Sequence, residues 1–143
     1  MSIKQISVFL ENKSGQIAEI TALLAEKNID LRAISIAETS DYGVLRMITD
    51  DADRSVSILL EAGHIVSMTP VTVVAVEDRP AGLSSLLSII ASSDISIDYM
   101  YSLFTKQAGI AYMVFRMSSG SGFADLLHEH GMRGVTAEEL GLK

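Results

Sequence analysis

The sequence predicts an α+β fold in which a unit of four strands and two helices occurs twice. The chain repeats itself at an offset of 66 residues: the segment Glu11–Ile17 reappears as Glu77–Leu83, with turn formers on turn formers and apolar residues on apolar residues. Within each half, stretches with strand periodicity alternate with stretches of helical spacing. We therefore expect two small domains, residues 1–70 and 71–143, each near the lower size limit for an independent core.

The first half reads in the order strand, helix, strand, strand, helix, strand. Every second residue of Gln5–Leu10 is aliphatic, which predicts the first strand. A helix follows up to Lys27, because apolar residues recur there at helical spacing. Asp50 or Asp51 caps the second predicted helix, and Gly63 lies just past its end. The apolar helix residues are Ile17, Ile20, Leu23 and Leu24, then Val56, Leu59 and Leu60; the remaining strands are Leu31–Glu38, Val44–Thr49 and Ile65–Thr69.

The second half repeats this order. Pro70 interrupts the apolar run that leads from Ile65 to Val76, and we expect it to mark the domain boundary because proline cannot donate to a central strand ladder. Thr136–Glu139 resembles a capping box for a final helical turn. The predicted helices are Gly82–Ser93 and one that begins near Phe123 and is ended by Gly131; the predicted strands are Thr72–Glu77, Ile97–Phe104, Ile110–Met117 and a short one near Met132–Val135.

Two such βαββαβ units predict two antiparallel sheets side by side, each with both helices on one face, which is the ferredoxin-like arrangement. In the second half, both faces of the strands are apolar: Tyr99, Tyr101 and Leu103 alternate with Met100 and Phe104. Sheets that are covered on both sides show this pattern. We therefore expect a homodimer in which sheet faces pack about 10 Å apart.

Composition and charge exclude several classes of function. A net charge of −7 and a pI of about 4.8 argue against nucleic-acid binding, which needs clustered Lys and Arg. The sequence holds no run of about 18 apolar residues, and it opens on a strand pattern rather than a signal peptide. Because it also contains no Cys, we expect a cytoplasmic protein. No cofactor or metal is expected, since His128 and His130 lie on different sides of a helix.

The turn after the first predicted strand is the place where a ligand site is expected. It precedes a helix N-terminus, where free backbone N–H groups and the helix dipole favour a carboxylate. Gly15 lacks a Cβ and lets a ligand approach the backbone, and Asn12 offers both a donor and an acceptor to a zwitterion. The alternative is an ordinary strand-to-helix connector, because turns of this composition are common.

Both copies of this turn resemble the N-[RK]-P-G-x-[LIV] turn of ACT domains. The matching segments are Asn12–Ile17 and Asp78–Leu83, and each lies about ten residues before a short segment with Asn or Asp, Lys27–Leu31 and Ser93–Ile97. ACT domains are βαββαβ modules that bind amino acids and regulate metabolic enzymes. The resemblance therefore implies a non-catalytic, amino-acid-binding regulatory protein that is built from two ACT domains. The chain departs from the pattern at Ser14, where the family usually has Pro, and at Ala81, where it usually has Gly.

The resemblance also implies two ligand sites, each where the turn of one domain meets the start of the second strand of the other. One site combines Asn12, Lys13 and Gly15 with Ser96 and Ile97. The other combines Asp78, Arg79 and Ala81 with Asp30 and Leu31. Ser14, Gln16 and Gly82 complete the two turns. We expect the first site to be the tighter one, because Ala81 adds a methyl group and the two Asp residues of the second site repel a ligand carboxylate.

Two alternative functions remain open at this point. The chain resembles small regulatory subunits of amino-acid biosynthetic enzymes such as acetolactate synthase, so a metabolic enzyme is a candidate partner. An acylphosphatase-like hydrolase on a ferredoxin-like scaffold is the enzymatic alternative, with Arg79 and the turn amides as the candidate anion cradle. That chemistry also needs a group to orient water, and the sequence offers no evident one beside Arg79.

Overall fold

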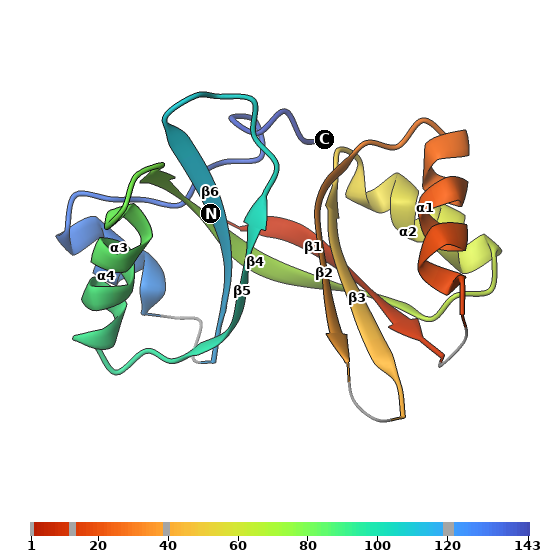
Figure 1. The fold of residues 1–143 in the computed structure, drawn as a ribbon, viewed down its shortest axis with the longest axis horizontal. Coiled ribbons are helices and arrows are strands. Elements are labelled where there is room, and N and C mark those ends of the chain that lie inside the picture. Colours follow the sequence, from red (N-terminus) through yellow and green to blue (C-terminus); the bar gives the residue numbers. More distant parts are fainter. Residues whose placement is uncertain (1, 12–13, 39–40, 119–121) are drawn as a thin grey trace. The chain divides into compact units, whose positions relative to one another are not determined.

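The computed structural model describes residues 2–11, 14–38, 41–118 and 122–143. The chain forms two compact units (Figure 1). The N-terminal unit comprises Lys4–Thr69 together with Gly141–Lys143, and the C-terminal unit comprises Pro70–Leu140 together with the N-terminal end up to Ile3. Each end of the chain thus belongs to the unit formed by the other half. No helix in the described part of the chain is long and apolar enough to cross a membrane.

The N-terminal unit is an antiparallel sheet with two helices on one face (Figure 1). Its strands lie in the order β2-β3-β1-β4, and Val8 of β1 is paired with Leu45 of β3. Asp51 caps α2 as expected, because its carboxylate accepts from the Arg54 N–H at 3.2 Å. The elements are β1 (Ile3–Leu10), α1 (Gln16–Glu26), β2 (Leu31–Glu38), β3 (Gly43–Thr49), α2 (Ala52–Glu61) and the start of β4 (Val66–Glu77).

The core of this unit lies between the sheet and the helices. Ile6, Val8 and Leu45 are fully buried and face Ile20 of α1 and Leu59 of α2. The strand and helix patterns read from the sequence therefore point to the same side, as an amphipathic layer requires.

The C-terminal unit repeats the arrangement with fewer strands. Its strands lie in the order β4-β6-β5, and Phe115 of β6 is paired with Met100 of β5 and Thr72 of β4. The rings of Phe115 and Phe123 meet edge to face at 5.6 Å in the core under the helices. The elements are the rest of β4, α3 (Gly82–Ala91), β5 (Ile97–Leu103), β6 (Ile110–Met117) and α4 (Phe123–Glu129).

Pro70 does not end a strand, so the expected pair of strands Ile65–Thr69 and Thr72–Glu77 is wrong. One strand, β4, runs from Val66 through Pro70 to Glu77. Proline fits an extended backbone and removes only one donor, and the β6 ladder starts beyond it at Thr72. The Pro70 carbonyl accepts from Arg116 Nη1 at 3.0 Å. The division into domains 1–70 and 71–143 stays a prediction.

The strand expected near Met132–Val135 is also absent from the structure. These residues form an irregular segment that is joined to β4 through the Val135 N–H and the Val73 carbonyl at 2.7 Å. The capping interaction expected next to it is present: Thr136 Oγ1 accepts from the Glu139 N–H at 3.1 Å. The Glu139 carboxylate accepts from Arg133 Nη1 at 2.7 Å and from the Thr136 hydroxyl at 3.1 Å, and the Arg133 contact is the main cause that lowers the pKa of Glu139.

Two apolar side chains lie outside the positions that the pattern predicted. Leu60 is 54% exposed, because it lies about 100° around α2 from the buried Leu59. Phe104 follows the end of β5 and is 57% exposed, so it does not contribute to the second apolar face of the sheet.

The second apolar face of the C-terminal sheet carries three buried side chains. Val114 and Phe115 are neighbours on β6 and therefore point to opposite faces, with Phe115 toward the helices. Val73 and Val114, which are paired across β4 and β6, are fully buried on the other face, and Leu103 is nearly so.

Candidate functional site

The turn between β1 and α1 leads directly into the start of a helix. Gly15 is the N-cap of α1 with φ of 82° and, as a glycine, has no side chain that could cap the helix. The first bond of the helix joins the Glu19 N–H to the Gly15 carbonyl at 3.0 Å. The N–H groups of Gln16, Ile17 and Ala18 therefore precede the helical ladder and have no acceptor within it. Asn12 and Lys13 lie outside the described residues, and Ser14 is exposed.

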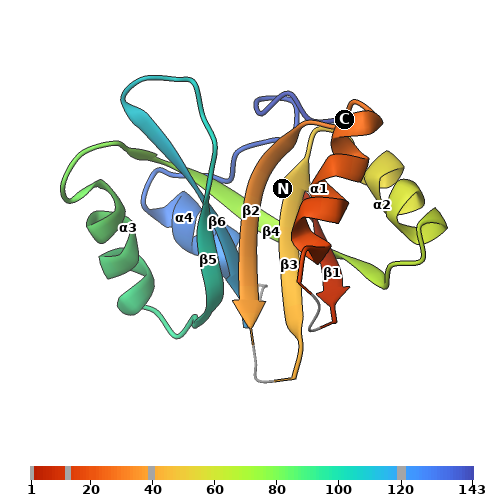
Figure 2. The same cartoon turned by 45° about the vertical axis from the view of Figure 1, so that its right-hand side comes forward.

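A pocket of about 240 Å³ opens beside this helix start. The ends of β1 and β2 and the start of α1 lie at the same edge of the N-terminal unit (Figure 2), so three elements border it. Two carboxylates, Glu11 and Glu38, lie on its wall, and the described lining residues include no Lys or Arg. The lining is Leu10, Glu11, Gly15, Gln16, Ile17, Ala18, Ile36, Glu38, Tyr42 and Gly43.

Gln16 is the polar residue at which α1 and the pocket meet. Its Oε1 atom is buried and has no hydrogen-bond partner among the described residues. A buried acceptor without a partner costs about 1–3 kcal/mol, so such atoms are rare away from functional sites. The polar end of the pocket therefore combines the first N–H groups of α1, an amide oxygen that has no partner among the described residues, and two carboxylates.

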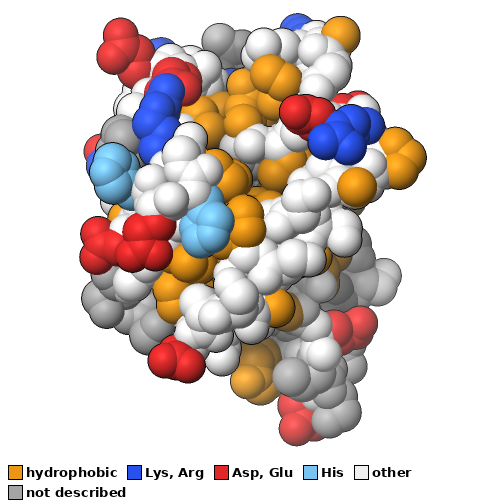
Figure 3. Space-filling view, turned by 90° about the vertical axis from the view of Figure 1, so that its left-hand side faces the viewer, with side chains coloured by type: hydrophobic (Ala, Val, Ile, Leu, Met, Phe, Trp, Pro, Cys, Tyr) orange, Lys and Arg blue, Asp and Glu red, His pale blue; other side chains and the backbone are white. Residues whose placement is uncertain are grey.

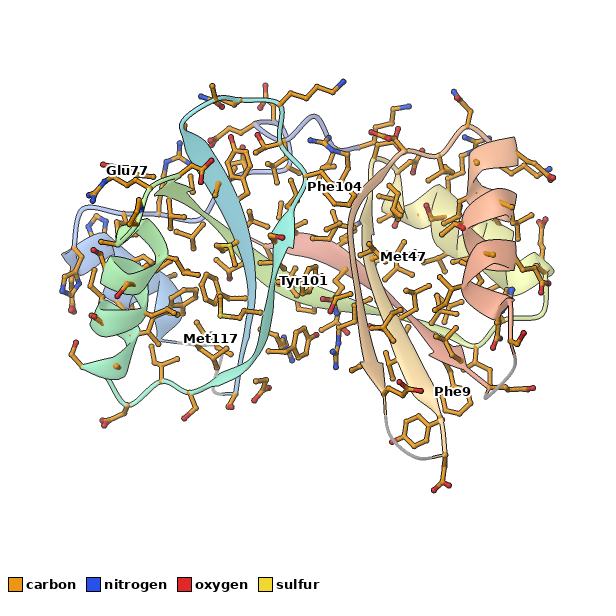
Figure 4. The ribbon with its side chains drawn as sticks, in the orientation of Figure 1. Phe9, Met47, Glu77, Tyr101, Phe104 and Met117 are labelled. Atoms are coloured by element: carbon orange, nitrogen blue, oxygen red, sulfur yellow. The ribbon has the colours of Figure 1, made fainter. Side chains whose placement is uncertain are left out.

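The matching turn before α3 is closed by its own residues. The Gly82 N–H, which is the first of α3, donates to the Arg79 carbonyl at 2.9 Å, and the Arg79 N–H donates to the Glu77 carbonyl at 3.0 Å. The Arg79 guanidinium is paired with the Glu77 carboxylate, which is labelled in Figure 4. A Cβ on Gly82 would collide with the Glu77 carbonyl oxygen. This glycine is therefore needed for packing, and the charge of Arg79 is already compensated.

A second pocket, of about 220 Å³, lies beside α3 in the C-terminal unit. Figure 3 shows the face that carries α3 and α4, where hydrophobic side chains are exposed between charged groups. The wall of this pocket is formed by Val76, Leu86, Ile89 and Met132, with the Glu77–Arg79 pair at its rim. Its described lining therefore includes an Arg, whereas that of the first pocket includes two Glu residues and no Lys or Arg.

The other predicted site residues lie at the starts of β2 and β5. Asp30 is exposed, its N–H donates to Asp50 Oδ1 at 2.9 Å, and its carboxylate lies 4.0 Å from Arg32 Nε. Leu31 is the first residue of β2. Ser96 is exposed, and its carbonyl accepts from the Ser118 N–H at 3.0 Å, directly before Ile97 begins β5.

Comparison with known proteins identifies the fold that carries these two turns. Residues 1–140 match the sequence model described as an ACT domain pair. The chain belongs to this family. The family resemblance of the two turns and the α+β fold with ferredoxin-like ACT repeats are thereby confirmed. No match was found among curated proteins.

Solved structures of similar shape agree with an ACT pair. The chain is 35% identical to protein BT0572 from Bacteroides thetaiotaomicron, with a TM-score of 0.89 over 99% of this chain and 96% of that one. It is 15% identical to the regulatory subunit of aspartate kinase from Thermus thermophilus, with a TM-score of 0.64 over 88% and 91% of the two chains. The corresponding subunit from Thermus flavus is 17% identical, with a TM-score of 0.59 over 90% of each chain. At these lower identities the likeness shows the fold alone.

The two ACT sites implied by the sequence each draw residues from both units. Gly15 belongs to the N-terminal unit and Ser96 to the C-terminal unit. Ala81 belongs to the C-terminal unit and Asp30 to the N-terminal unit. Their meeting stays a prediction. The lining residues that sequence reasoning missed include Glu11, directly after β1, and Ile36, Glu38 and Tyr42, which border the same ACT turn from within the N-terminal unit.

The two ACT turns differ in backbone strain, and this difference predicts a stability effect. Ala81 is the N-cap of α3 with φ of 79°, the left-handed conformation that Gly15 adopts before α1. This conformation costs a residue with a Cβ about 1–2 kcal/mol. We therefore expect Ala81→Gly to raise the free energy of unfolding in urea by about 1 kcal/mol.

The reverse change in the first turn is the matched control. A Cβ on Gly15 meets no atom within 4 Å, so Gly15→Ala should lower stability by about 1 kcal/mol through the backbone alone. An Ala81→Gly protein that is no more stable than the parent would show that the turn before α3 holds its alanine without strain.

Proposed function

We propose that this ACT domain pair is a non-catalytic regulatory protein that binds a free amino acid at the start of α1. The observation that carries the proposal is the pocket at the helix N-terminus after Gly15. The first N–H groups of α1 and the helix dipole favour the ligand carboxylate, while the carboxylates of Glu11 and Glu38 favour its ammonium group. A zwitterion thus finds complementary charge at one end of a small pocket.

The pocket suits one small metabolite. Its volume of about 240 Å³ is below the roughly 300–1,000 Å³ of clefts that hold drug-sized ligands. Asn12, Lys13, Ser14 and Gly15 of the same turn are proposed to complete the site from the loop, with Ser96 and Ile97 contributing as the family resemblance implies. The turn before α3 is proposed to be the weaker site, because the Arg79 guanidinium is already paired with Glu77.

The regulatory role is proposed because structures of the same fold are regulatory subunits of aspartate kinase. A cytoplasmic location and a metabolic enzyme as partner belong to the same proposal. The alternative of an acylphosphatase-like hydrolase is less favoured, since the Arg79 guanidinium of its anion cradle forms a surface ion pair with Glu77.

A thermal-shift screen of the twenty amino acids tests the proposal. A ligand that binds only the folded protein raises the melting temperature by mass action, so we expect at least one amino acid to raise it in a concentration-dependent way. Acetyl phosphate hydrolysis is the enzymatic control. No shift with any amino acid, or turnover of the acyl phosphate, would contradict the proposed function.

Assembly as a homodimer is part of the proposal and has its own test. Tyr99 and Tyr101 stack at 6.4 Å on the second face of β5 and are half-buried. If a second copy packs on them, Tyr101→Asp or Tyr112→Asp should give a monomer, because it places a charge in the interface. Light scattering checks this, and a parent protein that is a stable monomer at micromolar concentration would exclude the dimer.

A further inference from the structure

We infer that the Gln16 side chain accepts a hydrogen bond from the α-ammonium group of the bound amino acid, and that the protein keeps this residue although it lowers the stability of the free state. The inference rests on the proposed function and adds the residue that distinguishes an amino acid from a plain carboxylic acid. It follows from two properties of Gln16, the burial of its Oε1 atom without a partner and its place at the start of α1 beside the pocket.

The Oε1 atom of Gln16 differs from the other buried polar atoms of the chain. Among the described residues, it is the one buried side-chain nitrogen or oxygen atom without a hydrogen-bond partner. The fully buried polar residues of the same unit are paired: Gln5 donates to Ser7, and Thr49 is bonded to Ser55. An acceptor that is buried without a partner lowers stability, so its presence in a folded protein points to a group that it receives from outside.

The chemistry of the amide oxygen decides which ligand group it binds. Oε1 is an acceptor only, so it cannot bind a ligand carboxylate, whereas an ammonium group brings three N–H donors. The first N–H groups of α1, beginning with that of Gln16 itself, suit the carboxylate. One residue thus supplies a donor for the carboxylate and an acceptor for the ammonium group, and in an α-amino acid these two groups share one carbon atom.

The two carboxylates in the pocket lining are the alternative acceptors. Glu11 and Glu38 are both exposed, and Glu11 already takes part in another interaction. Water screens exposed charges, so these residues attract an ammonium group without fixing its position. Gln16 Oε1, in contrast, has no bond to give up when the ligand arrives, and rotation about the soft last torsion of the side chain brings it to the ammonium group.

Replacing Gln16 by methionine should therefore move stability and binding in opposite directions. Methionine has a similar length and helix propensity but lacks the amide oxygen. Gln16→Met should raise the melting temperature of the free protein by about 3–6 °C, because the unpaired acceptor is removed. It should weaken amino-acid binding at least about tenfold. Glu19→Met, on the exposed first turn of α1 and outside the pocket lining, is the control and should show neither the gain nor the loss.

Thermal unfolding of the full chain with each of the twenty L-amino acids, on the parent and on Gln16→Met, is the first test. Calorimetry then compares the amino acid that gives the largest shift with the carboxylic acid that lacks only its amino group. The parent should prefer the amino acid at least about tenfold. Gln16→Met should reduce this preference several-fold, because the acceptor that it removes serves the ammonium group alone. Gln16→Leu is the second apolar variant and should behave in the same way.

Three results would overturn the inference and leave amino-acid binding itself in place. A Gln16→Met protein that is no more stable than the parent would show that Oε1 has a partner in the free state. Failure of both Gln16→Met and Gln16→Leu to fold would show the same. An unchanged preference for the amino acid would place the ammonium group on another acceptor. If no amino acid shifts the melting temperature of the parent, the proposed function fails, and the inference with it.

Discussion

Replacing Gly82 by alanine is expected to destabilise the protein by about 3 kcal/mol or more. A Cβ at this position would lie closer than 3.0 Å to the Glu77 backbone oxygen, a distance that real Cβ atoms essentially never show. The obstacle is main chain at the end of β4, so no side-chain rotation relieves it. Either the turn or the first residue of α3 must move, and the bond from the Gly82 N–H to the Arg79 carbonyl is then lost.

Urea unfolding measures the effect, and Gly43→Ala is the matched control. A Cβ on Gly43 would meet its nearest atoms at 3.6 Å, which is ordinary contact, so the same chemical change should cost less than about 1 kcal/mol there. Equal stability of the two variants would mean that the turn before α3 is not packed as the structure shows.

Gly15→Val is expected to abolish the tight amino-acid site. The valine side chain branches at the point where the ligand carboxylate is proposed to approach α1, and its backbone must keep a φ of 82° that branched residues rarely adopt. We expect the affinity for the tightest amino acid to fall at least about tenfold. Asn12→Ala should cost about 1–3 kcal/mol of binding, the range for a lost partner of a buried polar group.

Backbone strain is separated from site blockage by Gly63→Val. Gly63 has φ of 87° after α2, and a Cβ there also meets no atom within 4 Å, but the residue does not line the pocket. The Gly63→Val variant should lower the stability of the protein as Gly15→Val does, and it should leave amino-acid binding intact. Asp78→Ala, in the turn before α3, should also leave the affinity of the strong amino-acid site nearly unchanged. Loss of binding in the Gly63→Val protein would attribute the effect of Gly15→Val to general destabilisation.

Most of the fold was predictable because its signals are local and occur twice. The aliphatic alternation of β1, the helical spacing before Lys27 and the Asp51 cap each depend on neighbouring residues, and the structure confirms them. Pro70 misled the prediction because its effect depends on whether a neighbouring strand needs its N–H. Whether the N–H is needed depends on strand pairing, which the residues next to Pro70 in the sequence do not reveal.

The two turns show how far sequence reasoning reaches into the site. Matching Ala81 to Gly15 was sound, since both residues are N-caps with a φ near 80°. The closure of the turn before α3 was not predictable, because it depends on where the Arg79 carbonyl and the Glu77 carboxylate point. Neither position is encoded in the motif.

The part of the pocket beside α1 that β2 forms was not predicted from the sequence. The family resemblance directed attention to the start of that strand, at Asp30 and Leu31, whereas the wall of the pocket is formed at its end by Ile36 and Glu38. The strand topology offered a signal. Because β1 and β2 both pair antiparallel with β3, they run in the same direction and their C-terminal ends lie at the same end of the sheet. The turn after β1 therefore had to lie beside the end of β2.

Titration calorimetry with the tightest amino acid from the screen tests the central claim most directly, because it counts sites per chain. One strong site per chain is predicted, with any second event clearly weaker, and Asn12→Ala and Gly15→Val should each remove or strongly weaken the strong event. Two equivalent sites per chain, or strong binding that survives both substitutions, would contradict the assignment of the ligand to the turn before α1.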